Sequence, residues 1–111
     1  MLAQKNRLTK KNDFDAAFKR GQGFKQGFLY FKIKNNNLKS SRFGFVVSKK
    51  FSKKATERNK IKRKLREIIK KKLPAIKRPI DVVVIVSPGA ENDFKKLEET
   101  VDMLLKKAKI L

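Results

Sequence analysis

The chain lacks the two side chains that perform most acid–base and nucleophilic chemistry in proteins. Its 111 residues include no His and no Cys. A disulfide, a thiolate metal site, a cysteine nucleophile and a histidine general base are therefore excluded. The close carboxylate pairs, Asp13 with Asp15 and Glu98 with Glu99, fall at a helix start or on a helix flank, where they suit the helix dipole. We assign no catalytic residue to the protein, and no spacing identifies a metal site.

What the chain has in abundance is positive charge. It carries 31 Lys and Arg against 10 Asp and Glu, a net charge of +21. Such an excess favours polyanions through counterion release, so nucleic acid is the leading partner and an anionic membrane surface the second. No apolar run approaches the roughly 18 residues of a membrane span, and residues 1–9 lack a signal-peptide core. We expect a cytoplasmic protein.

The charge is concentrated in one segment. Residues 49–72 contain thirteen Lys and Arg but only two carboxylates, Glu57 and Glu67. More than half of the net charge therefore falls within less than a quarter of the chain. Solubility alone does not call for so few carboxylates among so many cations.

This segment is predicted to form a helix over residues 57–73, with Thr56 as a cap and Pro74 as the stop. At about 100° per residue, one side is apolar (Ile61, Leu65, Ile68, Ile69) and the opposite side is polar (Asn59, Arg63, Arg66, Lys70). Arg binds phosphate through two hydrogen bonds and Asn both donates and accepts, so the polar side suits folded RNA. A merely solubilising face, with Asn59 in an ordinary cap-region role, remains an alternative. Membrane binding is disfavoured because the core needs the apolar side.

The remaining elements place this helix in a mixed α+β fold. We expect a helix over about residues 12–20, strands over 28–34 and 42–48 joined as an antiparallel hairpin, a central strand over 80–86, and a final helix from about Asp93. The order is α-β-β-α-β-α, with room for one extra short strand at no particular place. A single domain spans residues 1–111, and residues 1–11 are expected to be a mobile basic arm.

Three aromatic residues outside the basic segment are further candidates. Phe14 and Phe18 have i, i+4 spacing on the first helix, which is typical of core residues. Tyr30 alternates with Lys32 along a strand, and an aromatic ring among lysines on a sheet is a platform for unpaired bases. A rim position with the Tyr30 hydroxyl in water explains the pattern equally well.

Several segments together resemble one protein family. Ser48-Lys49-Lys50 and the run over residues 57–67 are similar to the signature of the bacterial ribonuclease P protein subunit. The segments 6–8, 13–14, 18–21 and 42–44 also resemble that family, in the same order along nearly the whole chain. Ordered matches of this kind are more specific than one basic motif.

The resemblance implies a small subunit that binds a large catalytic RNA and assists removal of the 5′ leader from precursor tRNA, the RNA and its Mg²⁺ performing the hydrolysis. No protein partner is evident. Together with the charge pattern, it gives these RNA-binding residues: Lys49, Lys50, Lys53, Arg58, Asn59, Lys60, Lys62, Arg63, Arg66 and Lys70. The resemblance places Phe14, Phe18 and Tyr30 in a leader-binding cleft on the sheet, and the strand pattern adds Lys32.

In fold, the family likeness implies a two-layer α/β sandwich with a left-handed βαβ crossover, similar to that of a ribosomal protein domain. General rules predict the right-handed form, found in about 98% of cases. The chain departs from the family pattern at Lys60, where Arg is usual, and at Ser52, where Gly is common. A small basic ribosomal or other structural RNA-binding protein remains an alternative function.

Overall fold

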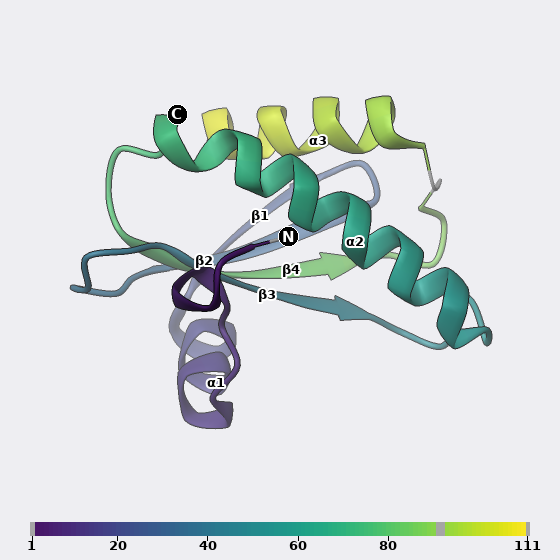
Figure 1. Ribbon diagram of the computed structural model, residues 1–111, viewed down its shortest axis with the longest axis horizontal. Helices are drawn as coiled ribbons and strands as arrows, with labels where there is room; N and C mark the ends of the chain where they lie inside the picture. Colours follow the sequence, from purple (N-terminus) through teal and green to yellow (C-terminus); the bar gives the residue numbers. More distant parts are fainter. Residues whose placement is uncertain (1, 91–92, 111) are drawn as a thin grey trace.

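The computed structural model describes residues 2–90 and 93–110, and its main body is a four-stranded sheet with three α-helices (Figure 1). The helices and strands are α1 (Lys11–Arg20), β1 (Gln22–Gln26), β2 (Leu29–Asn35), β3 (Arg42–Val47), α2 (Ala55–Lys72), β4 (Ile80–Val86) and α3 (Phe94–Lys107). Short 3-10 turns cover Gln4–Asn6 and Leu73–Ala75. The expected domain of residues 1–111 includes four residues outside those described: Met1, Glu91, Asn92 and Leu111.

The sheet has the strand order β1-β2-β4-β3, so β4 is central as predicted. It pairs antiparallel with β2 and parallel with β3. The predicted antiparallel hairpin between β2 and β3 is wrong, because β4 lies between them. The physical reason is the apolar sequence of β4, whose side chains are buried on both faces except for the half-buried Ile85. A strand of that composition is most stable with a neighbour at each edge.

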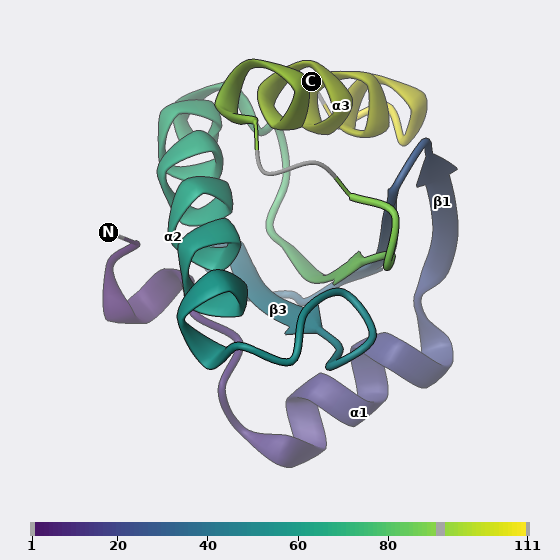
Figure 2. The same cartoon turned by 90° about the vertical axis from the view of Figure 1, so that its right-hand side faces the viewer.

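The two faces of the sheet are covered unequally. Both α2 and α3 pack on one face and enclose the main hydrophobic core, whereas α1 lies on the other face (Figure 2). Sheet, α2 and α3 form the expected two-layer sandwich, to which α1 adds a partial cover on the second side. A smaller cluster under α1 contains Leu8, Ala17 and Val83.

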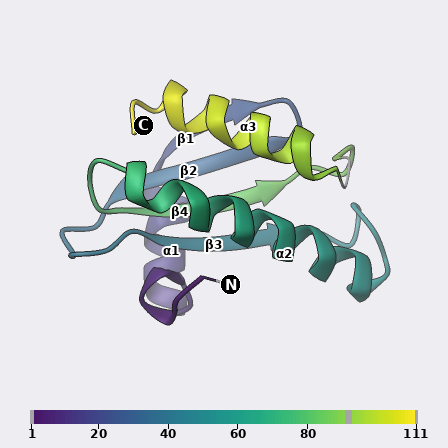
Figure 3. The ribbon, with the colours of Figure 1, turned by 45° about the horizontal axis from the view of Figure 1, so that its top comes forward.

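The connection from β3 through α2 to β4 is left-handed. In Figure 3, α2 lies toward the viewer, both strands run from left to right, and β4 lies above β3. The general rule for parallel strands is therefore wrong here, and the family likeness predicted the hand correctly.

The N-terminal residues do not form the mobile arm that was expected. Leu2 and Leu8 are buried, and the Leu8 amide donates to the Phe43 carbonyl at 3.0 Å. Arg7 forms an isolated parallel bridge with Phe43, next to the buried Asn6. The apolar Leu2 and Leu8 make burial favourable, and the open edge of β3 supplies backbone partners.

The helix starts were predicted with mixed success. The final helix begins after Asp93, close to the predicted start, and the Asp93 side chain caps it by accepting from the Lys96 amide at 3.2 Å. The predicted cap Thr56 is wrong, because α2 begins after Lys54 without a side-chain cap, as α1 does after Lys10. The extra short strand is present as β1, which pairs with β2. Within the described residues, no helix is both long and apolar enough to span a membrane.

Candidate nucleic-acid interface

The outward side of α2 and the turn before it carry a set of mostly cationic side chains, which we call the α2 surface. Its members are the ten predicted RNA-binding residues: Lys49, Lys50, Lys53, Arg58, Asn59, Lys60, Lys62, Arg63, Arg66 and Lys70. All but three are exposed; Arg58, Lys62 and Arg66 are half-buried. The apolar residues Ile61, Leu65, Ile68 and Ile69 point into the core, as the helical period predicted. The structure therefore brings all ten residues to one region.

Acidic partners lie beside the α2 surface and leave much of it uncompensated. Asp102 of α3 binds the Lys72 ammonium at 2.8 Å, and Glu98 approaches that of Lys71 at 3.9 Å. These pairs link the two helices along the flank of α2. Among the described residues, neither Lys60 nor Arg63 forms an ion pair. Such cations are free to neutralise phosphate groups.

The turn before α2 is held by Ser52. Its hydroxyl donates to a Glu57 carboxylate oxygen at 2.6 Å and accepts from the Lys54 amide at 3.2 Å. The Ser52 carbonyl also accepts from the Arg58 guanidinium at 2.8 Å. Ser52 is not among the described residues with a positive φ, so Ser replaces Gly here without backbone strain.

On the opposite face of the sheet, a row of side chains stays partly open beside α1. Tyr30 on β2, Ile85 on β4 and Val46 on β3 lie directly opposite one another in the strand register. All three are half-buried. We call them the sheet row. With neighbouring strands about 4.8 Å apart, the row is roughly 10 Å wide and presents an aromatic ring and two aliphatic groups.

Tyr30 and Lys32 form one group at the β2 end of this face. The Lys32 ammonium lies 5.7 Å from the centre of the Tyr30 ring, which is within the range of a cation–π contact. The Tyr30 hydroxyl lies over Gly23 of β1, in space that a Cβ atom would occupy. Gly23 therefore allows the ring to lean over the outer strand.

Phe14 and Phe18 have different surroundings, although both belong to α1. Phe14 packs against β3, where a Cβ atom on Gly44 would lie 2.7 Å from its ring. Phe18 is 47% exposed, which is unusual for a large apolar side chain. The structure thus divides the four predicted leader-binding residues, with Tyr30 and Lys32 on β2, Phe14 against β3 and Phe18 on the exposed side of α1.

A hollow of about 270 Å³ lies at the outer edge of β3, between α1 and α2. Phe14 borders it from α1 and Arg66 borders it from α2, with Arg7 and Phe45 between them. The Arg66 guanidinium lies 5.6 Å from the centre of the Phe45 ring. A cation over an aromatic ring suits a nucleotide, because the base can stack while the phosphate is neutralised.

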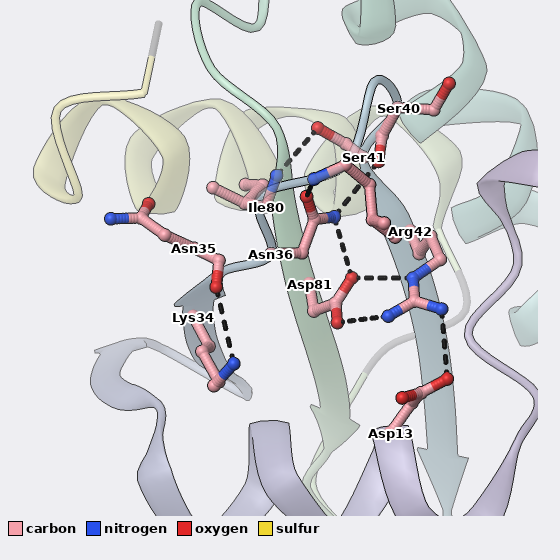
Figure 4. Close-up of polar contacts among 10 residues, drawn as sticks. Asp13, Lys34, Asn35, Asn36, Ser40, Ser41, Arg42, Ile80 and Asp81 are labelled. Carbon is pink, nitrogen blue, oxygen red and sulfur yellow. Dashed lines mark hydrogen bonds and ion pairs between the residues drawn. The ribbon is translucent and has the colours of Figure 1, made fainter.

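The position of α1 on the sheet is fixed by a polar network that Figure 4 shows. Arg42 of β3 donates to both carboxylate oxygens of Asp81, from Nε at 2.9 Å and from Nη2 at 2.6 Å. Its Nη1 also donates to Asp13 of α1 at 3.0 Å, and Asn36 donates to Asp81 at 2.9 Å. The hydrogen bond to Asp81 raises the pKa of the Arg42 guanidinium above its usual value. This network locks α1, and with it Phe14 and Phe18, onto the sheet.

Sequence reasoning missed Ile85, Val46 and the Asp13–Arg42–Asp81 network. Ile85 and Val46 become neighbours of Tyr30 only through the strand register, for which the sequence holds no local signal. The sequence does contain an indication of the role of Asp81. A charged residue at the start of an otherwise apolar strand needs a buried partner, and Arg42 begins the neighbouring strand.

These features define a class of small basic α+β protein in which a left-handed βαβ crossover carries the cationic helix. The chain matches the family described as Ribonuclease P over residues 2–109. It is 36% identical to the Ribonuclease P protein component of a Pseudanabaena species, covering 100% of this chain and 97% of that protein. It therefore belongs to the ribonuclease P protein family.

Solved structures agree with this assignment. A Staphylococcus aureus RNase P protein mutant with defective mRNA degradation activity superposes with a TM-score of 0.89 at 30% identity, covering 97% of this chain and 92% of that one. The RNase P protein from Thermotoga maritima has a TM-score of 0.79 at 34% identity, covering 91% and 96%.

Family membership confirms the role predicted from the sequence. The chain is the protein subunit of a tRNA-processing ribonucleoprotein enzyme and works with an RNA subunit. The comparisons give no support to the alternative of a ribosomal protein.

Proposed function

We propose that the protein binds the catalytic RNA of ribonuclease P through the α2 surface and the 5′ leader of precursor tRNA through the sheet row. It thereby assists Mg²⁺-dependent endonucleolytic cleavage that yields the mature tRNA 5′ end, in the cytoplasm. The chemistry is carried by the RNA, and this chain supplies binding and charge. The observation that carries the proposal is the uncompensated positive charge of the α2 surface.

The α2 surface suits a folded RNA. Its cations come from one rigid helix whose opposite side is buried, so they hold fixed positions. Arg63 can form two parallel hydrogen bonds with a phosphate, and Asn59 can bind a sugar hydroxyl or a base edge. Lys60, in place of the usual Arg, is exposed and keeps the charge while losing the forked contact.

The sheet row suits a single strand. Unpaired bases stack on aromatic rings, and Tyr30 offers one ring beside the Lys32 ammonium. Phe18, nearly half exposed, offers a second ring on α1, the helix that lies on the same face of the sheet. A precursor leader is single-stranded and mature tRNA has none, so this surface would contact the substrate but not the product.

The chain's carboxylates do not suit a Mg²⁺ site near α1. Arg42 binds both carboxylate oxygens of Asp81 and one of Asp13, and so occupies most of the oxygens that a cation would need. We therefore derive no step through a protein-bound metal. The protein instead lowers the repulsion between phosphates, so that RNA-bound Mg²⁺ suffices at lower concentration.

The experiment compares cleavage of precursor tRNA by the catalytic RNA alone and with the protein, across a range of Mg²⁺ concentrations. We expect the protein to allow cleavage at Mg²⁺ concentrations where the RNA alone is inactive. A variant in which Lys60, Arg63 and Lys70 are Ala provides the matched comparison, because these side chains are exposed and their loss leaves the core intact.

Two results would contradict the proposal. If the protein does not increase cleavage of precursor tRNA at low Mg²⁺, it has no assisting role. If the triple variant increases cleavage as much as the wild-type protein does, the α2 surface is not the RNA contact.

A further inference from the structure

A second cationic site lies at the far end of the molecule from the start of α2. It is an open hollow of about 420 Å³, formed where three segments distant in sequence meet. The segments are the N-terminal turn, the loop between β2 and β3, and the connection from α2 to β4. Figure 1 shows the loop and the connection at its left end. Its volume falls within the range of ordinary ligand sites.

The walls of this hollow are tied together by hydrogen bonds. The buried Asn6 side chain donates to the Ser41 carbonyl at 2.8 Å, joining the N-terminal turn to the loop. The Ser41 hydroxyl accepts from the Ile80 amide at 3.2 Å, joining the loop to β4. The Lys77 amide donates to the Ile110 carbonyl at 3.2 Å. These hydrogen bonds fix the positions of the segments that form the hollow.

Four cations surround the hollow, and none of the described residues that line it is a carboxylate. Lys5, Lys39, Lys77 and Arg78 come from all three segments, and all four are exposed. Among the described residues none of the four forms an ion pair, and Arg78 donates only to the neutral Asn35 amide oxygen, at 3.1 Å. Cations that converge without a partner leave a strong positive potential in a concave site.

The hollow continues the α2 surface. Leu73, Pro74 and Ile76, which follow α2 directly, form its apolar side. The N-terminal segment lies alongside α2 and contributes Arg7 to the hollow at β3 and Lys5 to this one (Figure 2). The second site therefore lies directly beyond the C-terminal end of α2, within reach of a polyanion that lies along this helix.

We propose that this hollow, which we call the end site, holds backbone phosphate of the catalytic RNA as a contact separate from the α2 surface. The assignment rests on the proposed function, since it takes the RNA to lie along α2. An open hollow admits a continuous chain, and its mixed lining of ammonium groups and aliphatic side chains matches the phosphate and ribose of a nucleotide.

Charge reversal with a matched control tests the end site. The variant K39E/K77E changes two exposed end-site lysines, and K95E/K106E makes the same charge change at exposed positions of α3. We expect K39E/K77E to bind the catalytic RNA about tenfold more weakly than the control, with a salt-dependence slope smaller by about 1 to 2 units. Thermal unfolding of both variants verifies that they are folded.

Site-directed cross-linking gives an independent readout, because the chain has no Cys. A photoreactive group attached to K77C is expected to cross-link to the catalytic RNA within the assembled enzyme, whereas the same group on K106C is not. Cross-linking of K77C to precursor tRNA alone, or to neither RNA, would overturn the assignment.

The result separates this inference from the proposed function. If K39E/K77E and K95E/K106E weaken binding equally while R63A still lowers affinity, the end site is wrong and the α2 surface stands. If none of the three variants changes the affinity, both proposals fail. Inorganic phosphate is the last probe. If millimolar phosphate alone competes with the RNA for the end site, the hollow is a site for free anions and the RNA assignment is overturned.

Discussion

The α2 surface and the sheet row are assembled in opposite ways. Every residue of the α2 surface lies within residues 49–70, and the helical period places the polar side chains outward. The sheet row draws Tyr30, Ile85 and Val46 from three strands, and α1 is held beside it by Arg42. One surface is local in sequence and the other exists only in the folded chain.

The difference has an energetic consequence. Substitutions of the exposed members of the α2 surface, such as Lys60 and Arg63, remove solvated charges and leave the packing unchanged, so they change binding without changing stability. The α1 side depends on a buried ion pair, whose loss alters the position of a whole helix. The two surfaces should therefore respond differently to salt, to mutation and to substrate.

The largest expected effect is that of salt on RNA binding. If the protein contacts roughly 6–10 phosphates, its affinity for the catalytic RNA falls by about three to five powers of ten between 50 and 200 mM salt. Filter binding across that range measures the slope. Stacking on the sheet row involves little charge, so the ratio of precursor to mature tRNA affinity should change far less. A salt-insensitive interaction would contradict the electrostatic account of the α2 surface.

The next effect is on stability, in the network beneath α1. Arg42→Ala leaves the buried Asp81 carboxylate without its cation and is expected to lower the free energy of unfolding by about 3 kcal/mol. Urea unfolding measures the loss. The control is Arg78→Ala, whose side chain is exposed and should cost less than about 1 kcal/mol. Equal losses would mean that the network does not hold α1.

Phe18→Ala tests leader binding at the surface beside α1 without disturbing the core. Loss of one stacked base costs about 1 to 3 kcal/mol, so precursor tRNA should bind the enzyme roughly tenfold more weakly while mature tRNA binds as before. The matched control is Met103→Ala on α3, an apolar side chain of similar exposure, 52% against 47%. Equal weakening of both tRNAs would count against leader binding at this surface.

Arg63→Ala tests the α2 surface in the complementary way. We expect about a tenfold loss of affinity for the catalytic RNA, a salt slope smaller by about 1, and no change in stability or in the ratio of precursor to mature tRNA binding. Titration of the catalytic RNA with each protein gives the affinities. A change in that ratio would show that the two surfaces are not independent.

The smallest effect concerns the turn before α2. Ser52→Gly removes the hydroxyl that binds Glu57 and the Lys54 amide, and should lower the free energy of unfolding by about 0.5 to 1 kcal/mol. Thermal or urea unfolding resolves a change of that size. An increase in stability would mean that the turn is strained by Ser after all.

The main features that are local in sequence were predicted correctly, whereas several that depend on contacts between distant residues were not. The extent and orientation of α2 were predictable, because a period of 3.6 residues in the apolar positions is a local property. The pairing of β2 with β3 was predicted wrongly, since the shortest loop suggested a hairpin and the two-sided burial of β4 decided otherwise. The N-terminal residues look like a basic arm because Leu2 and Leu8 are isolated in the sequence, yet both find the core.

The sequence by itself determined the charge, the absence of His and Cys, the helix that carries the cations and the family to which the chain belongs. Only the tertiary structure decided which side chains lie beside Tyr30, what holds α1 in place, and that cations from three segments meet at the end site. The reason is that helical periodicity acts over a few neighbouring residues, whereas strand order and loop convergence depend on contacts between residues far apart in the chain.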